Sequence, residues 1–128
     1  MNPPLENIGV SQRSRDILIT LKRRTGIGNW NVLCRWAFCE SLANHNRPVA
    51  LVGHVDSNIE MSWDTFAGKI SEPLLAAFEV RASKDGVSKN NPDRAIYFRS
   101  HLERGIAQLQ NAKSLSTLVA RSLVSASR

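Results

Sequence analysis

The chain has 128 residues, of which 42% are hydrophobic and 22% charged, so it has the size and composition of one globular domain with its own core. No run approaches eighteen apolar residues, which excludes a membrane-spanning helix, and the N-terminus MNPPLENIGV lacks a secretory signal, so we expect a cytoplasmic protein. The net charge of +6 favours a polyanionic partner, most often nucleic acid.

The positive charge is concentrated near the start of the chain. Residues 1–47 hold seven cations and three acids, whereas the remainder holds ten cations and eight acids. This imbalance directs the search for a binding surface to the first elements.

The first predicted elements are a short strand over Asn7–Val10 and a helix over Gln12–Arg24. Ser11 is a good N-cap for the helix, and Gly26 stands at its C-terminal cap. The stripe on this helix consists of Ile17, Leu18 and Leu21.

Three consecutive cations, Lys22, Arg23 and Arg24, fall in the last turn of this helix. Cations there complement the helix dipole, by about 0.3–1 kcal/mol each. Three in a row exceed what capping requires, which indicates a contact with a partner. With Arg13 and Arg15 on the same helix, they are our candidate phosphate-binding residues.

A second helix is predicted from an asparagine cap, Asn29 or Asn31, to about Ala43. Its apolar residues cover more than half of its circumference, so it is buried on several sides. Either it is the central helix of a monomer or one of its faces is a subunit interface. The apolar set is Val32, Leu33, Trp36, Ala37, Cys39, Leu42 and Ala43.

The middle of the chain reads as irregular over residues 44–62, with an apolar run at Val49–Val52 compatible with a strand. Helical spacing follows at Trp63, Phe66 and Ile70, and a helix is predicted over Leu74–Arg81. Leu74, Leu75 and Phe78 are expected to face inward, with Ala77 as a fourth candidate.

A longer helix is predicted from Pro92 or Asp93, and Gly105 within it indicates close backbone packing. A serine-rich tail ends the chain and keeps a helical apolar stripe. We therefore predict a compact, mainly α single domain over 1–128, with a core of about 7–110 and an extension at 111–128. The apolar side of the long helix is Ala95, Ile96, Phe98, Leu102, Ile106 and Leu109, and the stripe of the tail is Leu115, Leu118, Val119, Leu123 and Val124.

No catalytic constellation stands out, and we expect neither enzymatic activity nor a metal or cofactor. Asp56, Glu60 and Asp64 recur every four residues, which is more typical of a solvated acidic face than of a metal site. Cys34 and Cys39 lie about 140° apart on the predicted helix, so a bond between them is not expected.

The strand–helix–helix order at the front resembles a ribbon-helix-helix unit, in which the strand pairs with its mate from a second chain. The outward strand residues would be Asn7, Gly9 and Ser11. These side chains are poorly suited to hydrogen bonding with base edges, which argues against a sequence-specific repressor.

A closer resemblance lies in three separated motifs: LKRRTGIGNWNVLCRWAFCESL at 21–42, SWDTFAGKI at 62–70 and FRSHLERGIAQL at 98–109. They resemble the DndE family of the bacterial DNA sulfur-modification (phosphorothioation) apparatus. The match spans roughly residues 7–110, and only the stretch Gly28–Trp30 departs from the shorter turn of the family. The tail after residue 110 resembles an addition to the family pattern, and no family property is transferred to it.

The resemblance implies a compact helical fold, a homotetramer and binding of the DNA backbone, with a preference for nicked duplex. It implies partners within the modification machinery: a cysteine desulfurase, an ATP-pyrophosphatase-like sulfurtransferase and an SMC-like ATPase. It carries over no catalytic residues.

Two alternatives remain open from the sequence. One is a ribbon-helix-helix repressor or antitoxin. The other is an enzyme, either a nicking nuclease using the acidic residues Asp56, Glu60 and Asp64, or a sulfur carrier using Cys34 or Cys39.

Overall fold

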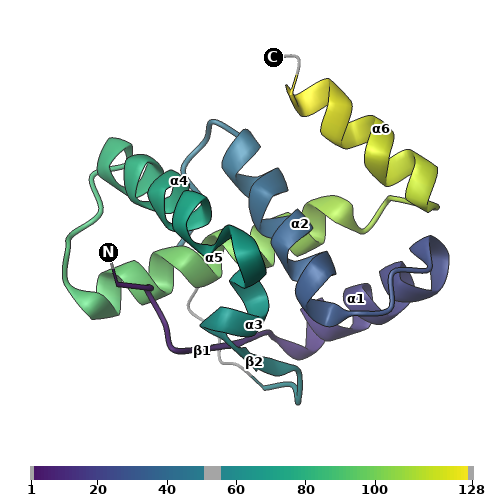
Figure 1. Ribbon diagram of the computed structural model, residues 1–128, viewed down its shortest axis with the longest axis horizontal. Coiled ribbons are helices and arrows are strands. Elements are labelled where there is room, and N and C mark those ends of the chain that lie inside the picture. Colours follow the sequence, from purple (N-terminus) through teal and green to yellow (C-terminus); the bar gives the residue numbers. More distant parts are fainter. Residues whose placement is uncertain (1, 51–55, 127–128) are drawn as a thin grey trace.

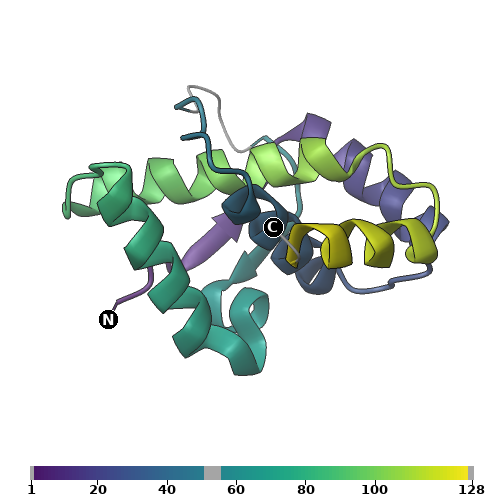
Figure 2. The ribbon, with the colours of Figure 1, turned by 90° about the horizontal axis from the view of Figure 1, so that it is seen from above.

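The computed structural model describes residues 2–50 and 56–126, and most of these residues are helical. The long helix α5 runs across the molecule, and α2 crosses it near its middle (Figures 1 and 2). No helix within the described ranges is long and apolar enough to cross a membrane. The elements are β1 (Asn7–Gly9), α1 (Gln12–Thr25), α2 (Trp30–Ala43), β2 (Glu60–Ser62), α3 (Trp63–Ala67), a 3-10 turn (Gly68–Ile70), α4 (Ser71–Lys84), α5 (Asn91–Leu109) and α6 (Leu115–Ala126).

The predicted strand–helix–helix order is present, but β1 finds its partner within the same chain. It pairs antiparallel with β2, with Asn7 opposite Ser62 and Gly9 opposite Glu60. The expectation from ribbon-helix-helix proteins, a strand paired with a second copy, is therefore corrected. Gly9 is buried and does not face outward as predicted.

Helix α1 begins and ends as its sequence predicts. The Ser11 hydroxyl accepts a hydrogen bond from the Ser14 amide, and Gly26 adopts a left-handed conformation with φ of 77°. Leu18 and Leu21 are fully buried beneath the helix.

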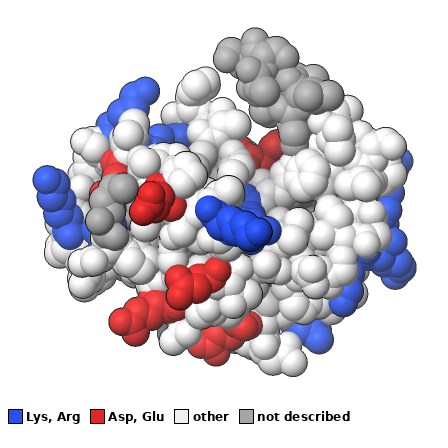
Figure 3. Space-filling model, viewed as in Figure 1, with Lys and Arg blue, Asp and Glu red and all other residues white. Residues whose placement is uncertain are grey.

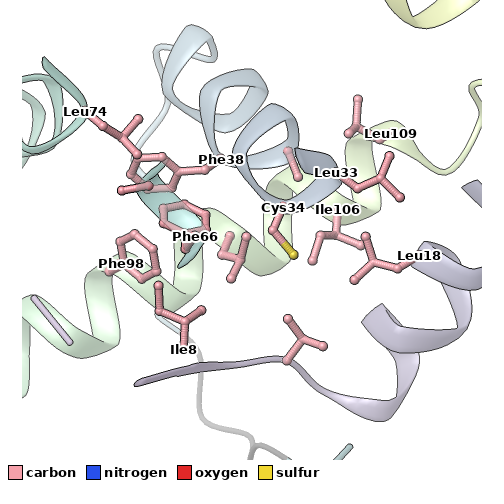
Figure 4. Packing of buried hydrophobic residues seen from close by; sticks show 14 of the residues in the cluster. Ile8, Leu18, Leu33, Cys34, Phe38, Phe66, Leu74, Phe98, Ile106 and Leu109 are labelled. Carbon is pink, nitrogen blue, oxygen red and sulfur yellow. The ribbon is translucent and has the colours of Figure 1, made fainter. Parts of the chain in front are cut away.

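The core forms where α2, α3 and α5 meet, around a group of phenylalanines (Figure 4). The rings of Phe38 and Phe98 lie 4.8 Å apart between centroids, and those of Phe66 and Phe98 lie 5.4 Å apart. The close packing predicted at Gly105 is confirmed, because a Cβ at this position would lie only 1.8 Å from the carbonyl oxygen of Ala37.

The buried face of α2 is narrower than the predicted apolar arc. Cys39 and Ala43 are exposed and Trp36 is partly exposed, whereas the core-facing residues include Cys34 and Phe38. The predicted asparagine cap is Asn29 by position, although its side chain makes no capping hydrogen bond.

The region after α2 differs most from the prediction. Val49 is 90% exposed and lies outside any strand, while Leu51 and Val52 lie outside the described residues. The strand occurs instead at Glu60–Ser62. Ile70, which follows Trp63 and Phe66 at helical spacing, is 46% exposed, whereas those two are buried.

The predicted helix over Leu74–Arg81 lies within α4, where Leu74, Leu75 and Phe78 are buried as expected. Ala77, the fourth candidate, is exposed.

The C-terminal segment, whose apolar stripe leaves open whether it is ordered, forms the helix α6 and docks through Leu118, which is fully buried. Leu115 and Val119 flank it at 45% and 42% exposure. The side chains of Leu123 and Val124, the rest of the predicted stripe, lie outside the described part of the structure.

Candidate nucleic-acid interface on helix α1

The N-terminus of α1 is held by two carboxylates from distant parts of the chain. The Ser11 amide donates to Glu103 Oε1 at 3.1 Å, and the Gln12 amide donates to Asp56 Oδ1 at 2.6 Å. The Ser14 hydroxyl also donates to Glu103. Negative charge at a helix N-terminus is favourable, and α1 has no acidic residue of its own in the first turn. Because protein carboxylates fill this position, a phosphate has to contact the side of the helix.

Helix α1 carries the five predicted cations, which we call the basic ridge: Arg13, Arg15, Lys22, Arg23 and Arg24.

Helical geometry divides the basic ridge into a crest and two flanks. At 100° per residue, Arg13 and Arg24 lie within about 20° of each other on one flank, and Arg15 and Lys22 do so on the other. Arg23 lies between the flanks, about 160° from the buried Leu21. Of the five, Arg23 therefore points most directly away from the core, while the two flanks lie about 180° apart, on opposite sides of the helix.

Among the described residues, the hydrogen bonds and ring contacts of the ridge side chains are with neutral groups. Arg15 Nε donates to Asn58 Oδ1 at 2.8 Å, and Arg24 Nη1 donates to the carbonyl of Gln110 at 3.3 Å. Lys22 Nζ lies 4.6 Å from the centre of the Trp30 ring. Arg13 and Arg23 are exposed and form no ion pair within the described ranges. The charges of the ridge are thus left available to a polyanion.

The surface charge is asymmetric. Lys and Arg side chains line the edge of the molecule where α1 lies, whereas acidic side chains gather over the region of β2 and α3 (Figure 3). Asp16 is the single acid of α1, and none occurs from Ile17 to Cys39. A concentration of one sign on one side raises the local potential and steers an oppositely charged partner.

Several other arginines are fixed inside the fold. Arg35 Nη1 donates to the Phe66 carbonyl at 2.8 Å. Arg104 Nη2 and Arg81 Nη1 each donate at 2.9 Å to the last carbonyls of α2, those of Ser41 and Leu42. These two arginines satisfy a helix end that has no basic residue of its own.

His101 lies in the same buried polar cluster. Its Nδ1 is 2.8 Å from the Ser41 hydroxyl, and the side chain is fully buried. Burial, with the neighbouring charges of Arg104 and Arg81, lowers the pKa of His101 to about 4. A histidine that stays neutral and enclosed is suited to a structural role rather than to acid–base work.

The acidic residues and cysteines that could serve an enzyme lie in different parts of the fold. Asp56 lies in a loop, Glu60 in β2 and Asp64 in α3, so the predicted acidic helical face is absent, and the described residues contain no cluster suited to a metal ion. Burial raises the pKa of the Cys34 thiol to about 12. Burial also raises the pKa of Cys39, although its residue is exposed at the surface.

The fold and the ridge together define a small, mainly helical protein with one strongly basic helix. The sequence matches the family described as DNA sulphur modification protein DndE over residues 7–117. The chain therefore belongs to the DndE family.

Two solved structures share the fold. A crystal structure of DndE from Escherichia coli B7A, involved in DNA phosphorothioation modification, has a TM-score of 0.69 and 22% identity, covering 85% of this chain and 98% of that one. A DndE mutant involved in DNA phosphorothioation has a TM-score of 0.65 and 20% identity, covering 84% and 98%. No curated protein matches the sequence.

Sequence reasoning found the ridge but missed what positions it. Nothing local in the sequence indicates that Glu103 and Asp56 reach α1 across 92 and 44 positions. The sequence prediction gives Trp30 no role, although the GNW segment places this aromatic residue shortly after three cations.

Proposed function

We propose that this protein is a non-catalytic DNA-binding component of the phosphorothioation machinery. It binds the sugar-phosphate backbone through the basic ridge of α1, and prefers nicked duplex. The observation that carries the proposal is the set of unneutralised, outward-facing cations on one helix. Family membership supports the link to DNA sulfur modification.

The dimensions of the ridge suit a phosphate backbone. Arg13 and Arg24 are eleven residues apart on one flank, which corresponds to about 16 Å along the helix axis. Phosphates of one strand advance about 3.4 Å per base pair, so this length matches about five of them. The ridge offers charge without base-edge donors held in fixed positions, which favours contact with the backbone over readout of sequence.

Several copies of the ridge would strengthen binding. We propose a homo-oligomer, a tetramer by family resemblance, in which each chain repeats the patch and increases the effective concentration of cations at the DNA. The other sulfur-modification proteins are the proposed protein partners. Light scattering of the purified protein tests the tetramer, and a monomeric mass would contradict it.

The decisive experiment is a salt titration of binding to intact, nicked and single-stranded DNA of one random sequence. For phosphate contacts, log K falls linearly with log salt, with a slope near −0.9 per phosphate neutralised in duplex. Replacing Lys22, Arg23 and Arg24 together by glutamate is expected to abolish binding at moderate salt. Unchanged affinity in this variant would contradict the role of the ridge.

A matched pair of single substitutions separates binding from folding. Arg23→Gln should reduce the magnitude of the salt slope by about 0.9 with unchanged thermal stability, because this side chain is exposed. Arg35→Gln removes a similar charge, but its side chain is committed to the Phe66 carbonyl. It should lower stability and leave the slope unchanged. An identical slope change in both variants would point to net charge alone.

The non-catalytic assignment has its own test. Supercoiled plasmid incubated with the protein and Mg²⁺ or Mn²⁺ should remain supercoiled. A nicking activity that copurifies with the protein and converts the plasmid to the relaxed form would favour the nuclease alternative. The repressor alternative is disfavoured by the in-chain pairing of β1 with β2, which provides a sheet without a second copy.

A further inference from the structure

Beyond the ridge, one side chain at its end has a chemistry that phosphate contacts do not require. Trp30 is the first residue of α2, and its ring is only partly buried. It packs against the core, and the Lys22 ammonium lies over the ring at 4.6 Å from its centre. An aromatic ring is thus held at the surface next to the last turn of α1, with its three consecutive cations.

The connection between the two helices is open to solvent around its glycines. Gly26 and Gly28 lie between Lys22 and Trp30, and a Cβ built at either glycine would meet no atom within 4 Å. Lys22 is itself exposed, and within the described ranges it forms no ion pair. The Lys22 side chain that lies over the ring is therefore flexible and can move away.

We propose that Trp30 is a stacking platform for an unstacked nucleobase, such as a base in single-stranded DNA or in an unpaired overhang. The base replaces the Lys22 ammonium on the ring, and the ammonium moves to the adjacent phosphate. Bases stack on aromatic side chains regardless of sequence, because every base has a π-face. In an intact duplex the bases are already stacked, so the platform acts only where a base is free.

This inference rests on the proposed DNA binding and adds a specificity-determining residue to it. The ridge binds any backbone, whereas Trp30 raises affinity for DNA with an accessible base. The test therefore compares two ligands, a single-stranded oligonucleotide and a blunt duplex of the same length, at one salt concentration.

The decisive variants are Trp30→Leu and Trp30→Phe. Both keep a large apolar side chain against the core, and only phenylalanine keeps an aromatic face. Trp30→Leu is expected to lose about five- to 150-fold in affinity for the single strand, with duplex affinity unchanged. Trp30→Phe should retain most of the wild-type affinity for both ligands.

Trp36→Ala, on the same helix and also partly exposed, is the matched control and should preserve the ratio of the two affinities. Equal affinities of the leucine and phenylalanine variants for the single strand would overturn the inference, as would a similar loss in Trp36→Ala. If wild-type protein binds neither ligand, the proposed function itself fails. If it binds duplex with a steep salt slope and Trp30→Leu changes nothing, only the stacking role fails.

Discussion

Glu103 on α5 accepts a hydrogen bond at 3.1 Å from the amide of Ser11, the residue that caps α1, although 92 positions separate the two in sequence. The same carboxylate accepts from the Ser14 hydroxyl one turn later. The orientation of the basic helix on the core is thereby coupled to the middle of the longest helix. This contact, together with the one from Asp56, sets which way the ridge faces.

Glu103→Gln should destabilise the fold by about 1–2 kcal/mol. The substitution removes a charge-assisted hydrogen bond and a negative charge at the N-terminus of α1. Urea denaturation measures the loss. In a double-mutant cycle with Ser14→Ala, the two effects should be less than additive, because the side chains share one hydrogen bond. Full additivity would mean that the contact contributes nothing.

Gly105→Ala should be among the most damaging single-methyl additions in the chain. Its Cβ would stand 1.8 Å from the Ala37 carbonyl oxygen, so the backbones of α2 and α5 would have to separate. Overpacking of this kind costs about 1–3 kcal/mol or more. Gly28→Ala is the control, because its Cβ meets open space, and its denaturation midpoint should stay close to wild type. Similar midpoints for the two variants would argue against the close approach.

Protonation of His101 should make stability fall as the pH drops below neutral. The pKa of this histidine is lowered to about 4 in the folded protein from an ordinary value of 6.5, so the unfolded chain binds the proton first. Stability is complete above the unfolded pKa and is lost as pH falls from about 6.5 toward 4. Between pH 7 and pH 5 the expected loss is about 2 kcal/mol.

Urea denaturation at pH 7, 6 and 5 measures this dependence, and His101→Gln serves as the control. The variant should be less stable at pH 7 but should lose most of the pH dependence within this window. An equal dependence in both proteins would assign the effect to other groups. Direct titration of the imidazole by NMR checks the pKa itself.

The two thiols should differ sharply in reactivity. Cys34 is fully buried and burial raises its pKa to about 12, whereas Cys39 is exposed on α2. Iodoacetamide at neutral pH should label Cys39 slowly, because its pKa is also raised, and should label Cys34 only after unfolding. Mass spectrometry of the alkylated protein distinguishes the sites. Rapid native labelling of Cys34 would revive the sulfur-carrier alternative.

The elements that sequence predicted well are those specified by adjacent residues. Helix α1 has a serine cap, an apolar stripe and a terminal glycine, and all three lie within the segment itself. The close packing at Gly105 could be predicted, because a glycine within a strongly helical segment usually allows another backbone to approach. The strand β2 was missed, because three residues with an exposed–intermediate–exposed pattern carry no apolar alternation.

The sequence by itself determined that the chain is mainly helical, and that five cations lie on one capped helix, because those properties depend on local spacing and composition. Only the tertiary structure decided which of the cations remain available. Arg35, Arg81 and Arg104 differ little from Arg23 in sequence, yet they are partly buried and bound to backbone carbonyls, whereas Arg23 and Arg24 are exposed. The physical reason is that the carbonyl groups that bind a guanidinium come from distant elements. They surround the side chain only when the helices pack.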